Sequence, residues 1–457
     1  METSVESESR RRMVSKVPGH VRRIEVDVNW FELAGIADRS GKVASYQCDA
    51  DAGIASDSAK SAPEGLDDAA PIQPVQKPVT SLVVTDEEGA DQAPVQAQEP
   101  DDQESQHELG RRLEVGDSGA DHTEQASELK STLAGLLGEE TTIELDKLKR
   151  LAWKGLEDET RPMTWKLLLN YLPVNASRRE ETLYMKRTSY RHAVDQYWKA
   201  SDWSPDEEAV FRQISVDIPR TCPDHKLFHV RQVQEILQRI LFVWALKHPA
   251  SGYVQGMNDL VSPFVYVFLL EQYEAKAEGG LLSRRSVEDA FSEEQLFYAE
   301  ADSYWCLTAL LETIQDYFTF SQPGIQKRVA YLEDFVQRVD PALREHLQKE
   351  NLQFLQFSFR WLNCLLMREL PFELMVRVWD TYMSEPDGFA VFHVYVCAAL
   401  LARFSDELRE MDFQELVMFL QNLPTKNWTR NDVEMLLSQA FMWRTIFDDK
   451  QFSKDLK

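Results

Sequence analysis

The chain has 457 residues, 43% of them hydrophobic, which is enough for one large domain or for two domains with buried cores. Its formal net charge of −26 argues against nucleic acid as a main ligand and against a broadly basic membrane-binding face, because both targets attract clustered Lys and Arg. The five cysteines are scattered and form no Cys-x-x-Cys pair, so they give no metal-site spacing and fit a reducing compartment. No secretory signal or membrane-spanning run is visible, and we expect a cytoplasmic protein.

The chain divides by aromatic content near residue 150. Trp30, Phe31 and Tyr46 are the only aromatic residues before Trp153. Residues 1–150 carry 31 acidic and 16 basic side chains and are rich in Ala, Ser, Gln and Pro. Such a segment buries too little apolar surface to offset the entropy of ordering, so we predict that it is mostly disordered.

Short stretches of this acidic region are exceptions. The stretch 26–36 can pair or dock through its two aromatic residues. The stretches 127–137 and 142–151 have helical spacing and lead toward the part of the chain that we predict to fold.

From residue 151 to residue 457 the dominant apolar period is helical, and ten of the eleven tryptophans lie there. Persuasive strands are absent, since no Asn-Gly or Asp-Gly hairpin separates alternating runs. We therefore predict an all-α fold with many mid-length helices around aromatic-rich cores. The predicted helices cover residues 231–247, 259–273, 288–318 (one helix or two abutting ones), 326–338, 343–349, 353–366, 372–383, 389–404, 413–421 and 431–441.

Two short motifs carry the chemistry. They are Ile214–Arg220 (ISVDIPR) and Gly252–Asn258 (GYVQGMN). They place Arg220 and Gln255 at the mouths of two helical segments. An arginine can neutralise charge on a phosphoryl group during transfer, and a glutamine amide can orient the attacking water. A GTPase needs both functions for fast hydrolysis, and a partner can supply both.

Asp217 and Arg220 stand three residues apart, a spacing that lets the carboxylate hold the guanidinium in one orientation. Pro219 and Pro223 stiffen the backbone around the arginine. The simpler interpretation is an Asp–Arg pair on the surface beside a loop, which is common in proteins.

Gln255 lies between Gly252 and Gly256, and glycines on both sides allow another chain or a phosphate to approach closely. The simpler interpretation is a polar helix start, with Asn258 or Asp259 as the cap.

Other motif-like features indicate structure. Arg161 and Trp165 are typical of a helix start with Pro162 in the first turn, and Trp165 is best explained as a core anchor. The segment Arg377–Asp380 predicts core aromatic packing with a charged rim. No phosphate-binding loop ending in Lys-Ser or Lys-Thr occurs, so the chain does not resemble a nucleotide-binding NTPase.

At these residues the sequence resembles the TBC-domain family of Rab GTPase-activating proteins. Three family blocks occur in order, namely Arg-x-x-x-Trp at Arg161–Trp165, Ile-x-x-Asp-x-x-Arg at Ile214–Arg220 and Tyr-x-Gln at Tyr253–Gln255. Phe359–Trp361 and Arg377–Asp380 are similar to downstream family segments. The resemblance covers residues 151–457, with a signature core at about 155–385.

A finer likeness points to the branch called member twenty-two in the vertebrate naming. It is carried by Ile218–Thr221, Lys247–Tyr253, Asn363–Glu369 and Leu420–Thr425.

The resemblance implies an all-helical, V-shaped domain whose groove receives a GTP-bound Rab. It implies that Arg220 and Gln255 are catalytic fingers supplied in trans, that Asp217 and Tyr253 support them, and that Asp217 orients the arginine. GTP and Mg²⁺ would be held by the partner, so no cofactor of the chain's own is expected. The resemblance also implies vesicle trafficking, indirect membrane association through the Rab or adaptors, and a location at the Golgi.

Two alternatives remain open. The helical domain can be a non-catalytic Rab-binding or scaffold protein, tethered through its acidic N-terminal third. A helical-repeat interaction protein unrelated to GTPases is disfavoured, because the sequence has no repeat period.

Overall fold

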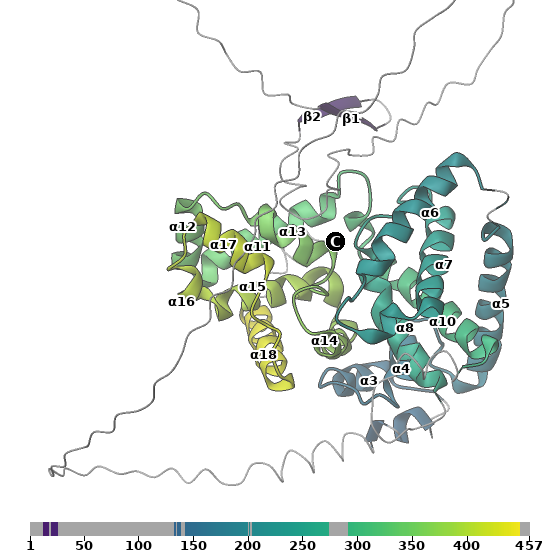
Figure 1. Ribbon diagram of the computed structural model, residues 1–457. Coiled ribbons are helices and arrows are strands. Elements are labelled where there is room, and N and C mark those ends of the chain that lie inside the picture. The colour runs from purple at the N-terminus through teal and green to yellow at the C-terminus, as the bar shows by residue number, and fades with distance from the viewer. Residues whose placement is uncertain are drawn as a thin grey trace, which may run out of the picture. The chain divides into compact units, whose positions relative to one another are not determined.

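The computed structural model describes residues 12–17, 20–25, 132–133, 135–138, 142–199, 201, 203–273 and 291–447. Helices dominate these residues (Figure 1), and the predicted all-α class is confirmed. The helices are α3 (Leu145–Ala152), α4 (Arg161–Leu168), α5 (Arg179–Tyr197), α6 (Pro205–Asp217), α7 (Arg231–Lys247), α8 (Met257–Gln272), α10 (Glu293–Thr313), α11 (Pro323–Val339), α12 (Pro341–Lys349), α13 (Phe354–Asn363), α14 (Phe372–Ser384), α15 (His393–Arg403), α16 (Ser405–Leu408), α17 (Phe413–Gln421) and α18 (Arg430–Phe447). Short 3-10 segments are η1 (Ala176–Arg178), η3 (Ile218–Arg220), η4 (Lys226–His229) and η5 (Gln315–Tyr317), and η6 (Gly388–Phe392) is a π-helical turn.

One strand pair lies within the region that we predicted to be disordered. Strands β1 (Arg12–Val17) and β2 (His20–Glu25) pair antiparallel, with Met13 opposite Ile24. The prediction that persuasive strands are absent concerned residues 151–457, where the described residues form no strand, so this pair lies outside that prediction. The overlooked signal is Pro18-Gly19, a dipeptide that favours turns, between two runs containing β-branched residues. The stretch 26–36 and most of the predicted disordered region lie outside the described residues.

Apolar periodicity predicted several helices well. Helix α7 has the predicted limits, and its apolar residues are buried as the pattern required. The predicted single or double helix over 288–318 is α10 followed by η5. Helix α13 ends earlier than predicted, because Leu365 and Leu366 adopt left-handed backbone angles, with φ of 49° and 61°.

Two polar helices were missed. Helix α5 spans 19 residues but buries only Arg179, Tyr190 and Ala193, and its apolar stripe is sparse and only partly buried, so the sequence pattern is weak. Helix α6 is similar, since it buries only Ile214 and Asp217. Helix α5 packs against α7 and α10, and α6 packs against α7, so both depend on tertiary packing for their stability.

The core is a continuous aromatic and aliphatic cluster. Trp165 of α4 packs edge-to-face on Phe264 of α8, with ring centroids 5.8 Å apart, and lies 6.1 Å from Trp379 of α14. The prediction that Trp165 is a core anchor is confirmed. The core also includes Leu136 and Leu148, N-terminal to the predicted domain boundary at residue 151.

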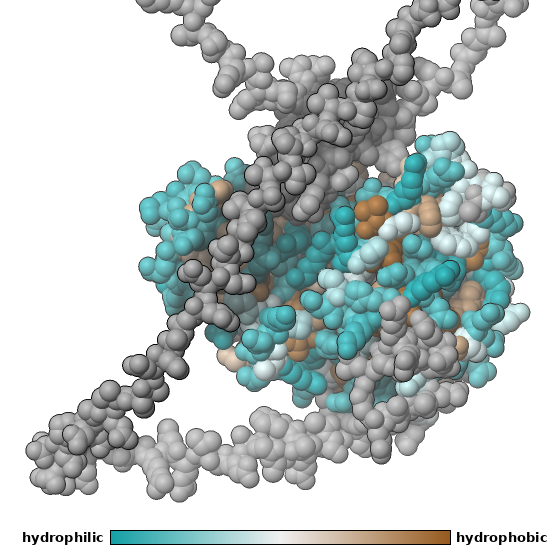
Figure 2. All heavy atoms as spheres, in the orientation of Figure 1, coloured by the Kyte–Doolittle hydropathy of each residue, from teal (hydrophilic) through white to brown (hydrophobic). Residues whose placement is uncertain are grey.

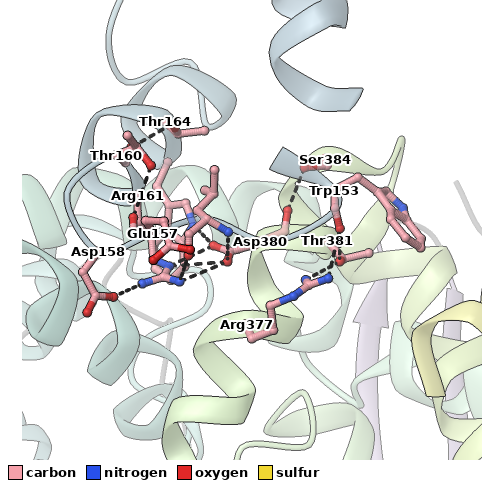
Figure 3. A network of polar contacts seen from close by, with 12 residues as sticks. Trp153, Glu157, Asp158, Thr160, Arg161, Thr164, Arg377, Asp380, Thr381 and Ser384 are labelled. Atoms are coloured by element: carbon pink, nitrogen blue, oxygen red, sulfur yellow. Dashed lines mark hydrogen bonds and ion pairs between the residues drawn. The ribbon is translucent and has the colours of Figure 1, made fainter. Parts of the chain in front are cut away.

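Arg161 joins the start of α4 to α14, more than 200 positions along the chain (Figure 3). Its Nε lies 3.1 Å from Asp380 Oδ1, and the same oxygen accepts a 2.8 Å hydrogen bond from Trp165 Nε1. The other carboxylate oxygen accepts from the Leu156 amide at 2.9 Å. Asp380 is completely buried and Arg377 is only 4% exposed. These two residues are therefore core cross-links rather than the charged rim that the sequence suggested.

The surface in Figure 2 is mostly hydrophilic, with hydrophobic side chains in small separate patches. Among the described residues, no helix is both long enough and apolar enough to cross a membrane. The predicted V shape stays a prediction.

The buried Arg161–Asp380 contact gives a stability prediction. Asp380→Ala removes the buried partner of the Arg161 guanidinium, which keeps only the exposed Asp158 carboxylate, and it removes an acceptor from Trp165 and Leu156, so we expect the free energy of unfolding to fall by about 3–5 kcal/mol. Urea titration measures this change. The control is Asp406→Ala, whose partner Arg409 lies at the surface, and it should cost at most about 1 kcal/mol. Equal losses in the two variants would contradict the assignment.

Candidate functional site

The first motif projects Arg220 from an anchored backbone. Helix α6 starts with a capping box in which Ser204 and Glu207 satisfy each other's backbone N–H groups. It runs directly into η3, and Ile214 and Ile218 are buried on the inner side of these two elements. Arg220, the last residue of η3, is exposed. The backbone is therefore held by apolar packing while the guanidinium stays in contact with solvent.

The second motif forms the connection between α7 and α8. Helix α7 ends at Lys247, and the ring of the next residue, His248, stacks on Trp244 with centroids 4.2 Å apart. Gly252 and Gly256 both have positive φ, 61° and 108°, and Gly256 is the residue at which α8 is capped. Gln255 lies between them and is half-buried.

Asp217 connects the two motifs. Its Oδ2 accepts a 2.9 Å hydrogen bond from the Tyr253 hydroxyl, and its Oδ1 lies 3.4 Å from Gln255 Nε2. Burial raises the pKa of Asp217, while the Tyr253 hydroxyl and the nearby Arg220 charge oppose that rise. Burial beside this carboxylate also raises the pKa of Tyr253 well above its usual value, so its hydroxyl remains a donor. One network thus joins three predicted residues, namely Asp217, Tyr253 and Gln255. Arg220 lies three positions after Asp217 in the chain.

The expected pairing of Asp217 with Arg220 is not formed. Among the ion pairs of the described residues, Arg220 has no carboxylate partner. The reason is that the Asp217 carboxylate is 2% exposed and turned inward to the 253–255 segment, whereas Arg220 faces solvent. Asp217 therefore contacts Tyr253 and Gln255 in this structure, and its role in orienting Arg220 stays a prediction.

The simpler interpretation of Asn258 as a polar cap is partly correct. Its Oδ1 accepts from the Gly256 amide at 3.1 Å, which satisfies a free N–H group at the start of α8. Its Nδ2 also donates to Thr221 Oγ1 at 3.0 Å, the residue directly after Arg220. Asp259 has a different task, because its Oδ2 accepts a 2.8 Å bond from Arg368 Nε.

Two residues of this neighbourhood were not singled out from the sequence. Asn363 donates from Nδ2 to the Gln255 carbonyl at 2.9 Å, and Arg368 pairs with Asp259. Each lies more than 100 positions from its partner, so no local pattern reveals the contact. The only signal was that both lie in the segment that carries the branch resemblance.

The two glycines differ in their environment. A Cβ on Gly252 would meet nothing within 4 Å, so this position leaves room for another molecule, as predicted. A Cβ on Gly256 would lie 2.3 Å from Asn363 Nδ2. Gly256 is therefore required by an internal contact, and the prediction that it opens the site to a partner is wrong.

No metal centre is indicated at this site. In the part of the chain that the structure describes, no group of three or more His, Cys, Asp and Glu side chains is arranged to hold a metal ion. The site therefore offers an exposed guanidinium, that of Arg220, and the carboxamide of Gln255, both near the buried carboxylate of Asp217.

Comparison with known proteins identifies the class to which this arrangement belongs. The profile of the Rab-GTPase-TBC domain matches residues 158–409. The crystal structure of the Ypt/Rab-GAP domain of Gyp1p superimposes with a TM-score of 0.65 at 45% identity, covering 70% of this chain and 99% of that one. The chain therefore belongs to the Rab-GTPase-TBC domain family.

Relatives confirm the resemblance to the member-twenty-two branch. GTPase-activating protein gyp1 of Schizosaccharomyces pombe is 48% identical over 311 residues, which are 67% of this chain and 59% of that protein. Human TBC1 domain family member 22B is 48% identical over 315 residues, which are 69% of this chain and 61% of that protein. This chain thus matches only about three-fifths of the length of these curated relatives.

The glycines give a matched pair of variants. Gly252→Ala introduces only left-handed backbone strain and should lower the free energy of unfolding by about 1 kcal/mol. Gly256→Ala adds a collision with Asn363 and should cost about 1–3 kcal/mol more. Urea unfolding of both variants tests the difference. Equal costs would mean that Asn363 moves aside freely.

Tyr253→Phe tests the buried carboxylate through pH. Because the folded-state pKa of Asp217 is raised, ionising it costs stability as the pH rises above the ordinary carboxyl value near 4, and the Tyr253 hydroxyl reduces that cost. Removing the hydroxyl should therefore lower the free energy of unfolding by about 1.5–3 kcal/mol at pH 7. The loss should be clearly smaller at pH 4, where a proton bound to Asp217 neutralises the buried carboxylate. Urea unfolding at the two pH values measures this. Tyr184→Phe, at a surface position, should change stability at neither pH, and a pH-independent loss in Tyr253→Phe would contradict the role of Asp217.

Proposed function

We propose that this protein accelerates GTP hydrolysis by a Rab-family small GTPase and supplies Arg220 and Gln255 in trans. One observation carries the proposal: Gln255 Nε2 lies 3.4 Å from the carboxylate of Asp217, three residues before the exposed Arg220. Asp217 thereby links the loop that carries Gln255 to the element that ends at Arg220, 35 positions earlier in the chain, which supports a joint action of the two side chains.

The chemistry fits what phosphoryl transfer requires. Hydrolysis of GTP needs charge stabilisation and an oriented water more than covalent participation of the protein. A planar guanidinium spreads two N–H donors toward the phosphate oxygens, and such an arginine supplied in trans is worth about 10³–10⁵ in rate. The carboxamide of Gln255 can both donate to and accept from the attacking water. GTP and Mg²⁺ come with the partner, so the chain needs no cofactor for this reaction.

The contacts of Arg220 and Gln255 leave both side chains available to contact a partner. Arg220 is exposed, and Gln255 Nε2 is held by a contact near the outer limit of a hydrogen bond. The amide can therefore leave Asp217 for a water at little cost. Asp217 keeps its 2.9 Å bond from Tyr253 when this happens, so the buried charge is not left without a donor.

The relatives support the same activity by name. One is called a GTPase-activating protein, and the superimposed crystal structure is of a Ypt/Rab-GAP domain. By this proposal the chain acts in vesicle trafficking on a GTP-bound Rab, and its contact with membranes, including the Golgi, is indirect through that Rab or adaptors.

The alternative is a non-catalytic Rab-binding or scaffold protein. It predicts retention of GTP-bound Rab with unchanged hydrolysis. A panel of GTP-loaded Rab GTPases, assayed for phosphate release with and without the full chain, separates the two functions and identifies the substrate.

Substitution of the two fingers tests the mechanism on a Rab that the panel identifies. Arg220→Ala should reduce stimulated hydrolysis by about 10³-fold or more, and Arg220→Lys should also fail because a point charge cannot replace the planar fork. Gln255→Ala should likewise abolish most of the stimulation. The temperature of thermal unfolding should stay unchanged in these variants, since neither side chain is part of the hydrophobic core. Arg409→Ala serves as the matched control and should keep full activity. Wild-type phosphate release in either finger variant would refute the mechanism.

A further inference from the structure

Asn363 is a buried amide at the meeting point of three segments. It is the last residue of α13 and is 3% exposed. Its Nδ2 donates to the Gln255 carbonyl at 2.9 Å, and its Oδ1 accepts from Gln322 Nε2 at 3.3 Å. One carboxamide thus ties the segment that carries Gln255 to the start of α11.

The contact is steric as well as polar. The Gln255 carbonyl accepts from the Asn363 side chain, and the next residue is Gly256, whose missing Cβ leaves the space that this side chain fills. With φ of 108°, the Gly256 backbone rests directly on the amide group. The hydrogen bond prevents the loop from moving away, and the close approach prevents it from moving nearer.

The support behind Asn363 is rigid. Trp361 and Leu362, directly before it, are fully buried, and the Trp361 carbonyl accepts from the Leu366 amide at 2.9 Å. The left-handed residues Leu365 and Leu366 turn the chain sharply after the helix. Gln322, its second partner, is itself fixed in a left-handed conformation at the N-cap of α11, with φ of 46°.

We propose that Asn363 is a positioning residue for Gln255: it fixes the main chain of that residue so that the side chain can leave Asp217 and still reach the attacking water. This inference rests on the function proposed above. The main chain and the side chain of Gln255 are restrained differently. Its main-chain carbonyl accepts a 2.9 Å hydrogen bond from Asn363, whereas its side-chain amide makes only a 3.4 Å contact with Asp217. Such an arrangement leaves the side chain free to move and its origin fixed.

The contact needs an amide in particular. The Gln255 carbonyl requires a donor and Gln322 Nε2 requires an acceptor, and among side chains of this size only Asn offers both. Asn363→Asp keeps the shape but places a carboxylate oxygen against the carbonyl. The loop should therefore shift without the loss of any core volume.

The test uses the full chain and a Rab that the wild-type protein stimulates. We expect Asn363→Asp to lower kcat by about tenfold to a hundredfold, because small displacements of a catalytic group have effects of this size, while KM changes little. Two double variants, measured under single-turnover conditions, separate the roles. Adding Asn363→Asp to Gln255→Ala should not lower the hydrolysis rate any further, whereas adding it to Arg220→Ala should lower that rate. Wild-type kcat, or an equal further loss in the Gln255→Ala background, would overturn the proposal.

A second measurement does not depend on any Rab. Hydrogen exchange of the backbone amides of residues 252–256 should become faster in Asn363→Asp and, to a smaller degree, in Gln322→Ala. Ser358→Ala is the matched control, since Ser358 is a buried polar residue of α13 whose hydroxyl donates to the Phe354 carbonyl of the same helix. It should leave both exchange and kcat unchanged. Unchanged exchange in both Asn363→Asp and Gln322→Ala would overturn the positioning role.

The two proposals fail in different ways. If Arg220→Ala and Gln255→Ala keep full activity, the finger mechanism is wrong, yet exchange still reports whether Asn363 holds the loop. If the finger variants are inactive and Asn363→Asp is fully active, only the role of Asn363 is refuted.

Discussion

A carboxylate removed from water is costly unless donors surround it, and Asp217 meets this constraint with groups from the segment 253–255. The same requirement that keeps the acid satisfied therefore brings Tyr253 and Gln255 to the end of α6. Arg220 follows on η3, one short turn later, and is left in solvent. The geometry of the site thus follows from the way in which the buried charge of Asp217 is compensated. A change in any one of Asp217, Tyr253 and Gln255 should therefore affect the other two.

Buried acids hold the rest of the helical domain together in the same way. Asp302 of α10 accepts from Lys166, Arg187 and Tyr171, which come from α4, α5 and the turn between these two helices. Glu300 on the same helix accepts from Arg239 and Tyr190. Asp380 of α14 accepts from the Leu156 amide and from Arg161, and so holds the start of α4 in place (Figure 3). Removal of one partner leaves an uncompensated charge inside, so these contacts specify which helices meet more than they add stability.

Helices with an apolar face could be predicted from the sequence, as α7 shows, because burial imposes a period on them. Helix α5 could not, since most of its surface is polar and only three of its 19 residues are buried, too few to impose a clear apolar period. The two motifs located Arg220 and Gln255, but not the contacts that position them. Asp217 was expected to face the arginine and faces the glutamine segment instead. Asn363 lies 108 positions from Gln255, and only the folded chain relates such residues.

The bridge from Gln322 through Asn363 to the Gln255 carbonyl has a consequence for how such domains lose their activity in evolution. By the proposed mechanism, a chain can retain both the arginine and the glutamine and still lose much of its activity through an exchange at Asn363, or part of it through an exchange at Gln322, both distant in sequence from either finger. Degenerate copies of the domain that merely hold a GTPase would then be indistinguishable by their signature motifs from active ones. The amide between α11 and α8 would be the place where the two diverge.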